Sequence, residues 1–235
     1  MGLPTAGVLC LQGSSEPHLA RLAELHADGT LAAPPRAVRQ RRDLDGLTHL
    51  ILPGGESTTI RHLLDLFELT DELVARHRAG TLALFGTCAG AILLGQDDGT
   101  RPRRLGLLDA TLARNAYGRQ VDSFSAELSL ELPAARGGGD DRRESASTAE
   151  PTAFHGVFIR APRFVRIGAG VRVLATRAVE PGKSAEPVLV AAPGLLAGTF
   201  HPELTRDLRI HRWFVTRPPE TPPAGSRHPI GAATA

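Results

Sequence analysis

Residues 84–95 read LFGTCAGAILLG, and this stretch decides the fold. Apolar residues lead into a cysteine with a glycine two positions away on each side, and a second apolar segment follows. The pattern predicts a buried strand over 81–87, a tight turn at Cys88 and then a helix. "AGVLCLQ" at 6–12 and "HLILPGG" at 49–55 predict two more buried strands, each ending in a glycine turn.

Helical patterns alternate with these strands. "HLARLAELHADG" follows the first strand, and "STTIRHLLDLFEL" follows the second, with Ser57 or Thr58 placed to cap the helix. Strands and helices that alternate in this way indicate an α/β domain with a mainly parallel sheet covered on both faces. Later segments, such as "FHGVFIRAP" and "PVLVAAPGLLAGTF", are strand-rich, so a mixed sheet is expected.

Composition limits the partners and the compartment. The chain has 27 Lys+Arg against 25 Asp+Glu, one Trp and one Tyr, so a nucleic-acid surface is not expected. No secretory signal is evident at the start, and no apolar run reaches the roughly 20 residues that span a bilayer, so no membrane contact is expected. The two cysteines are expected to be free thiols in a cytoplasmic protein.

The length of 235 residues fits one fairly large domain, which we place at 1–216. Within it, residues 134–150 are glycine-rich, charged and aperiodic, which indicates a surface insertion. Residues 217–235 are proline-rich and are expected to form a disordered tail.

The turn at Cys88 allows two interpretations. In G-x-C-x-G between a strand and a helix, the cysteine is exposed at the carboxyl edge of the sheet, and the helix N-terminus favours its thiolate. The same residue could instead be a small buried hydrophobic side chain, which is the commonest fate of a free cysteine. Cys10, inside an apolar strand without such a turn, is expected to belong to the core.

A base for this thiol is available in "GTFHPEL" at 198–204. His201 and Glu203 are two positions apart, so in extended backbone, which Pro202 favours, their side chains leave from the same face. A carboxylate beside the imidazole fixes its tautomer and stabilises the imidazolium. A surface or core histidine is the plain alternative. A metal site is not expected, because no Cys or His cluster with ligand spacing accompanies the pair.

An acyl-transfer site also needs donors for a developing oxyanion. "LPGGES" at 52–57 places glycine backbone at a strand-to-helix turn, although a plain turn before a capped helix explains it equally well. All three segments follow strands that should end at one edge of the sheet, where doubly wound folds bind ligands.

At these residues the chain resembles the glutaminase subunits of pyridoxal 5'-phosphate synthase, which belong to the triad (class I) glutamine amidotransferases. The resemblance implies a flavodoxin-like, three-layer α/β/α domain with a mixed, mainly parallel sheet. The turn at Cys88 and His-Pro-Glu are common to the wider superfamily, while "GGESTT", "RNAYGRQVDSF" and "GVFIRAP" are particular to this family. The matching segments are "GVLCLQG", "LILPGGESTTIRHLL", "LFGTCAGAILL", "LGLLDATLARNAYGRQVDSF", "GVFIRAP" and "GTFHPELT", between 7 and about 215.

The resemblance implies a role for each matching residue. Cys88 would attack the carboxamide carbon of L-glutamine, His201 would carry the proton to the leaving ammonia, and Glu203 would orient His201. Backbone N–H groups of Gly55 and Ala89 would form the oxyanion hole. The glutamine would be held by Gly55, Glu56, Ser57, Arg114, Ile159 and Arg160.

The chain departs from the family at two places outside this triad. Glu16-Pro17-His18 stands where the family usually has Arg-Glu-His, and Ala116-Tyr117 stands where it has Ser-Phe. The insertion at 134–150 is also longer than the family leads one to expect. These departures concern the partner surface and access to the site.

The implied function is hydrolysis of glutamine, with ammonia passed to a synthase subunit that builds pyridoxal 5'-phosphate, and without any cofactor or metal. One alternative is the glutaminase subunit of another amidotransferase, such as imidazole glycerol phosphate synthase. A second is a catalytically silent, flavodoxin-like binding protein, and a third is a stand-alone thiol hydrolase.

Overall fold

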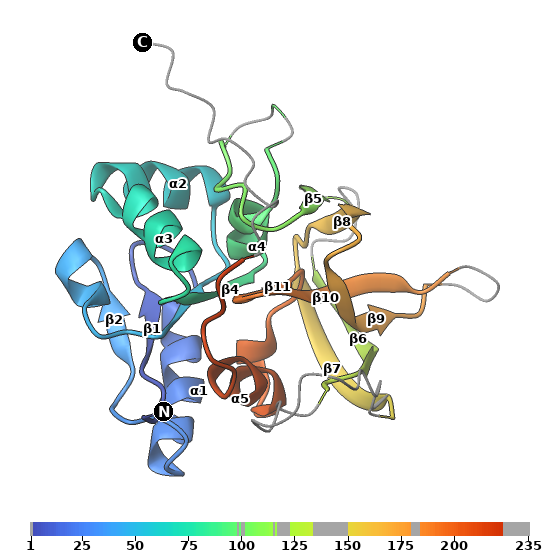
Figure 1. Cartoon of the computed structure of the whole chain (residues 1–235). Helices are drawn as coiled ribbons and strands as arrows, with labels where there is room; N and C mark the ends of the chain where they lie inside the picture. Colours follow the sequence, from blue (N-terminus) through green and yellow to red (C-terminus); the bar gives the residue numbers. More distant parts are fainter. Residues whose placement is uncertain are drawn as a thin grey trace, which may run out of the picture.

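The structure, a computed structural model, describes residues 2–97, 99, 102–114, 116, 123–133, 150–179 and 184–222. Within these residues, nine strands form one sheet, in the order β2-β1-β3-β4-β11-β10-β9-β6-β7 (Figure 1). The first five strands of this order are parallel to one another. They are β2 (Arg36–Val38), β1 (Ala6–Leu9), β3 (His49–Leu52), β4 (Ala83–Thr87) and β11 (Leu195–Gly198).

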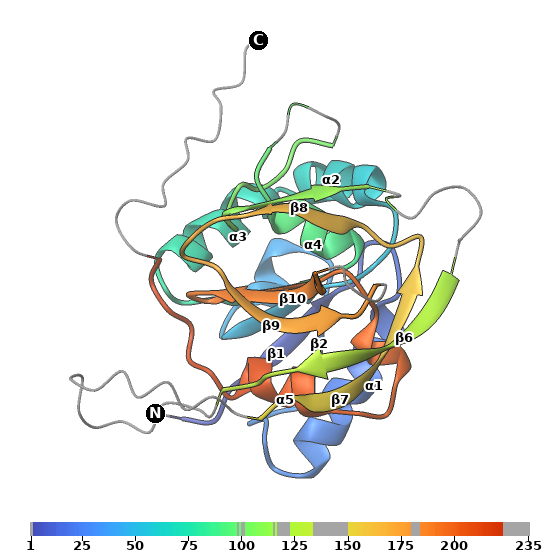
Figure 2. The same ribbon diagram turned by 90° about the vertical axis from the view of Figure 1, so that its right-hand side faces the viewer.

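The other four strands pair antiparallel and extend the sheet beyond β11. A separate antiparallel pair, β5 with β8, lies beside this half of the molecule (Figure 2). Their bounds are β10 (Glu186–Ala192), β9 (Arg172–Arg177), β6 (Ser123–Leu130), β7 (Thr152–Ile159), β5 (Ala110–Ala113) and β8 (Arg163–Ile167).

Helices cover both faces of the parallel half. In Figure 1, α2, α3 and α4 lie on one face, and α1 and α5 lie on the other. None of the described helices is both long and apolar enough to span a bilayer. The helices are α1 (Ser15–Ala27), α2 (Ser57–Leu66), α3 (Leu69–Arg78), α4 (Ala89–Leu94) and α5 (Arg209–Val215), with short 3₁₀ helices at Arg41–Leu44 and Pro202–Leu204.

Each buried strand supplies side chains to two cores, because successive residues point to opposite faces. On β3, Leu50 and Leu52 pack towards α2, α3 and α4, while Ile51 packs towards α1 and α5. This explains why the central strands read as continuous apolar runs instead of alternating ones. The predicted three-layer α/β/α fold is confirmed, and the parallel strands have the flavodoxin-like order.

The change from parallel to antiparallel pairing follows from the connections. A parallel neighbour needs a crossover of a dozen or more residues, whereas antiparallel strands can be joined by a tight turn. β10 and β11 are joined by only two residues, with Gly194 at a φ of 65°, so they must run antiparallel. Of the segments predicted to be strand-rich, "FHGVFIRAP" contains most of β7 of this antiparallel half, and "PVLVAAPGLLAGTF" contains most of β10 and the parallel strand β11 that joins the two halves.

The predicted insertion at 134–150 lies outside the described residues except for Glu150, and the predicted tail does so from residue 223 onward. Residues 217–222 contact the domain. The guanidinium of Arg217 lies 3.6 Å from the centroid of the Trp213 ring, and its carbonyl accepts a hydrogen bond of 2.7 Å from His49 Nε2. A Cβ on Gly80 would lie 2.4 Å from Thr221 Oγ1, so this segment passes close to the end of α3.

Candidate active site

Sheet register brings the cysteine turn and the His-Pro-Glu segment together. The last residues of the neighbouring parallel strands, Thr87 of β4 and Gly198 of β11, are paired. The backbone N–H of Cys88 then donates to Gly198 O over 2.8 Å, and that of His201 donates to Val157 O of β7 over 2.8 Å. The two side chains therefore meet at the carboxyl edge, as predicted.

Cys88 occupies a strained turn. Its φ is 49° and its ψ is −104°, a combination that non-glycine residues rarely adopt and that is often found at functional sites. The flanking glycines are needed because the backbone is crowded. A Cβ on Gly90 would lie 2.0 Å from Leu52 O, and one on Gly86 would lie 2.5 Å from the carbonyl of Gly90. The sequence pattern thus reflects steric requirements on both sides of the cysteine.

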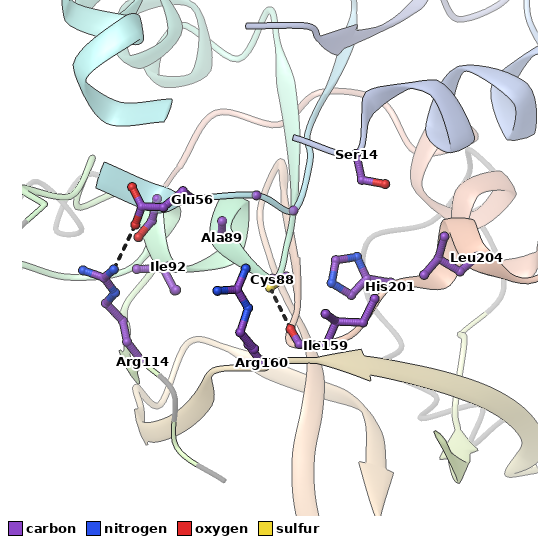
Figure 3. Close-up of a pocket in the computed structure, with 13 residues that line it drawn as sticks. Ser14, Glu56, Cys88, Ala89, Ile92, Arg114, Ile159, Arg160, His201 and Leu204 are labelled. Atoms are coloured by element: carbon purple, nitrogen blue, oxygen red, sulfur yellow. Dashed lines mark hydrogen bonds and ion pairs between the residues drawn. The ribbon is translucent and has the colours of Figure 1, made fainter. Parts of the chain in front are cut away.

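A cavity of about 350 Å³ opens in front of this turn (Figure 3). It brings together nine of the ten site residues named from the sequence, and the tenth, Glu203, lies behind His201. Cys88 is 7% exposed, and its Sγ lies 3.8 Å from Ile159 O. The cavity is lined by Ser14, Gly54, Gly55, Glu56, Ser57, Cys88, Ala89, Ile92, Arg114, Ile159, Arg160, His201 and Leu204.

His201 and Glu203 form a buried pair, with Nδ1 and Oε1 2.7 Å apart. The contact agrees with the prediction, but the extended backbone predicted for this segment is wrong. Glu203 lies in the 3₁₀ helix that starts at Pro202, so a tight turn, not extended backbone, brings its carboxylate back to the ring.

The imidazole of His201 faces Cys88 in Figure 3, and its buried Nε2 has no aligned hydrogen bond to the described residues. Burial lowers the pKa of His201, but the interactions with the Cys88 sulfur and Glu203 outweigh burial and raise the pKa to about 10. A histidine with that pKa is protonated at neutral pH. This electrostatic arrangement suits a thiolate–imidazolium pair.

Glu56 has two functions at the far wall of the cavity. Its carboxylate accepts a hydrogen bond from Thr59 N over 2.7 Å and so caps α2, which the sequence had assigned to Ser57 or Thr58. Ser57 is instead the first residue of the helix, and it is buried. The other carboxylate oxygen of Glu56 lies 3.0 Å from Arg114 Nη2, and Arg160 extends between this ion pair and Cys88 (Figure 3).

The pattern of the SNO glutamine amidotransferase family matches residues 8–218. The chain belongs to this family. The α/β/α fold and the meeting of Cys88, His201 and Glu203 at the carboxyl edge of the sheet agree with that membership.

Named relatives of this amidotransferase are similar along nearly their full length. A pyridoxal 5'-phosphate synthase subunit PdxT of Thermus thermophilus is 46% identical over 211 residues, which cover 89% of this chain and 95% of that protein. PdxT of Mycobacterium ulcerans is 42% identical over 222 residues, covering 92% and 96%. A crystal structure of a glutamine amidotransferase, 43% identical, superposes with a TM-score of 0.72 and covers 90% of this chain and 97% of that one.

Sequence reasoning missed several residues of this amidotransferase site. Ser14 lies in the turn after "LCLQG", and its N–H donates to Gly54 O over 2.9 Å, which ties that turn to the glycine turn. Ile92 and Leu204 add apolar surface to the cavity. The glycine turns can be recognised in the sequence. Ile92 and Leu204 cannot be assigned to the cavity in this way, because nothing in the sequence distinguishes them from the other apolar residues of the chain.

Gly54 has a specific steric function in this family member. A Cβ there would lie 2.4 Å from His201 Cε1 and 3.3 Å from Cys88 Cβ. Gly54→Ala is therefore expected to push the imidazole away from the sulfur and to lower kcat about a hundredfold, since misplacement by about 1 Å has costs of that order. Steady-state glutamate release and thermal unfolding measure the effect.

Gly170→Ala is the matched control, because a Cβ on Gly170 meets no atom within 4 Å. The control variant should keep wild-type kcat and Tm. Wild-type kcat in Gly54→Ala would show that the position of His201 tolerates this contact.

Proposed function

We propose that the chain hydrolyses L-glutamine to L-glutamate and ammonia. The observation that carries the proposal is the strained Cys88 at a cavity of about 350 Å³, with His201 facing it and Glu203 2.7 Å behind. A glutamine side chain fits the chemistry of this arrangement, since its carboxamide carbon is an acyl centre with a poor leaving group. Such a group needs both a strong nucleophile and a proton donor.

In the proposed reaction, the Cys88 thiolate attacks the carboxamide carbon, and the carbonyl oxygen becomes an oxyanion. Backbone N–H groups of Gly55 and Ala89 would stabilise it. Ala89 is the first residue of α4, so its N–H has no acceptor within that helix. The His201 imidazolium gives its proton to the leaving nitrogen, which departs as ammonia. Water then attacks the thioester while His201 accepts its proton, and glutamate leaves with the thiolate restored.

The charged groups of the cavity complement an amino acid. Arg114 and Arg160 are suited to the α-carboxylate of glutamine, and Glu56 is suited to its α-ammonium group. Ser57, Gly55 and Ile159 complete the proposed binding residues. The Glu56–Arg114 ion pair at 3.0 Å must then rearrange or share its charges when the substrate enters.

The named relatives are subunits of pyridoxal 5'-phosphate synthase. We propose that this chain likewise forms a hetero-oligomer with a cytoplasmic synthase subunit, which uses the ammonia with a pentose phosphate and a triose phosphate. No nucleic acid, membrane or cofactor takes part in this proposal. The alternative is a synthase of another pathway, such as imidazole glycerol phosphate synthase, and a pull-down that identifies the synthase subunit decides between them.

Hydrolysis is expected to be weak in the isolated chain and strongly stimulated by the synthase partner. The peptide between Gly54 and Gly55 carries the Gly55 N–H, and the hydrogen bond from Ser14 N to Gly54 O sets its orientation. Because glycine adopts either sign of φ, this peptide can also turn its N–H away from the oxyanion. A missing oxyanion donor costs on the order of 10²–10³ in rate, so a partner that completes the hole should raise kcat by about that factor.

The measurement is glutamate release at saturating glutamine, alone and with excess synthase subunit. Binding of the partner is monitored separately by analytical ultracentrifugation. Full activity in the isolated chain, unchanged when the bound partner is present, would contradict this coupling.

A further inference from the structure

Behind the proposed triad lies a buried group of three polar side chains. His18 of α1, Thr87 at the end of β4 and His211 of α5 are all fully buried. His18 Nε2 lies 3.1 Å from Thr87 Oγ1 and 3.3 Å from Glu203 Oε2, while His18 Nδ1 lies 3.0 Å from His211 Nε2. His18 thus links the carboxylate that contacts His201 to the residue that immediately precedes Cys88.

Both of these imidazoles are neutral. Burial, followed by the nearby His211 and His201, holds the pKa of His18 well below its usual value. Burial and the positive charge of Arg21 lower the pKa of His211 to about 3, while Asp207 acts in the opposite direction. The edge-to-face contacts of both rings with Phe85 add to this apolar enclosure. A neutral imidazole carries one N–H, so each ring has one donor and one acceptor nitrogen.

The direction of the hydrogen bonds between these side chains follows from His211, which is the last residue of the hydrogen-bonded group. His211 Nδ1 is buried and has no hydrogen bond to the described residues. An orphan N–H there would be costly, because a buried donor without an acceptor loses its hydration without compensation. The proton of His211 is therefore on Nε2 and is donated to His18 Nδ1. That leaves the proton of His18 on Nε2.

The opposite tautomers, with both protons on Nδ1, are unfavourable for two reasons. They would leave an unpaired N–H on His211 and would turn the lone pair of His18 Nε2 towards the Glu203 carboxylate. With the proton on Nε2, the positive end of the N–H dipole lies between Thr87 Oγ1 and Glu203 Oε2. At 3.3 Å and without an aligned angle, the contact with Oε2 is a charge–dipole attraction and not a full hydrogen bond.

We propose that His18 is a positioning residue for glutamine hydrolysis, which holds the Glu203 carboxylate against His201 through its Nε2–H, with His211 fixing the tautomer. The inference rests on the proposed function. His18 touches neither the cavity nor the sulfur, so it acts through Glu203. Its removal should free the carboxylate to rotate and weaken the support for the imidazolium of His201.

Three variants separate positioning from packing. His18→Leu removes both nitrogens, whereas His18→Gln keeps an N–H donor at a similar reach. His49→Leu is the matched control, because His49 is also buried, contacts Thr48 Oγ1 and Arg217 O through its two nitrogens, and begins β3 at the opposite edge of the sheet. Steady-state kinetics use the complex with the synthase subunit, and long-range ¹H–¹⁵N spectra of the chain read the tautomers and the pKa of His201.

We expect Nε2–H tautomers for His18 and His211. In His18→Leu, kcat should fall about ten- to a hundredfold with little change in KM, by analogy with the loss caused by removing a hydrogen-bond partner of a metal-binding side chain. The pKa of His201 should fall in the same variant. His18→Gln should restore most of both properties, and His49→Leu should lose thermal stability without loss of kcat.

A His18 proton on Nδ1 would overturn the proposal. So would a folded His18→Leu variant with wild-type kcat and wild-type His201 pKa, or equal losses in His18→Leu and His18→Gln. If His18→Leu does not fold, the tautomers of His18 and His211 and the kinetics of His18→Gln still test the proposal. The spectra need no substrate, so a chain with the expected tautomers and no glutaminase activity would contradict the proposed function and not the hydrogen-bond direction.

Discussion

Cys88→Ala is expected to abolish glutamate release, with a loss on the order of 10⁶-fold, as for removal of the nucleophile in serine proteases. The sulfur is the only atom lost, and the cavity offers no second nucleophile among its described lining residues with a base beside it. Alanine keeps the Cβ and therefore the same backbone strain at φ 49°. Stability and partner binding should remain close to wild type.

The measurement is glutamate release by the complex at saturating glutamine, together with thermal unfolding. Cys10→Ala is the matched control, since Cys10 is also a free cysteine but does not line the cavity. More than a few per cent of wild-type turnover in a folded Cys88→Ala variant would remove Cys88 from its proposed role.

Glu203→Gln is expected to lower kcat by roughly 10³–10⁴-fold with little change in KM, close to the loss caused by the matching carboxylate-to-amide exchange in serine proteases. The amide has a similar shape but no negative charge. Since Glu203 is one of the groups that raise the pKa of His201 to about 10, that pKa should fall in the variant. The imidazolium then stabilises the thiolate less well. The loss is expected mainly in the stabilisation of the transition state, and therefore in kcat.

Steady-state kinetics of the complex and the NMR titration of His201 measure the two effects. Glu72→Gln is the control, because it removes an ion-paired carboxylate on α3, which contacts Arg41 and Arg76 and does not line the cavity. An unchanged kcat in Glu203→Gln would mean that another group orients His201.

The fold and most of the site could be predicted because their signals are local. The strands at 81–87 and 49–55 are short apolar runs that end in glycine turns, and the structure confirms them as β4 and β3. Cys88 and His201 were expected at one edge because both follow buried strands. Membership of the amidotransferase family is confirmed by the match over residues 8–218.

The contact between His18 and His211 joins distant segments, so no local pattern reveals it. His18 and His211 are 193 positions apart, and each looks like an ordinary helical residue in sequence. The cap at Glu56 was missed because serine and threonine have the stronger general preference, while the longer glutamate reaches Thr59 N from its own position. The contact of His201 with Glu203 was predicted, but the 3₁₀ turn that produces it was not.

The place of β11 in the sheet has a consequence for how the protein is made. This strand comes near the end of the described chain, yet it lies between β4 and β10 in the middle of the sheet. A nascent chain from which β4 and Cys88 have already emerged still lacks both the strand that joins the two halves and the segment that carries His201 and Glu203. Such non-local pairing makes folding slow and leaves the edge of β4 open until synthesis is almost complete. Cys88 is therefore brought next to His201 only when the last large part of the fold is in place.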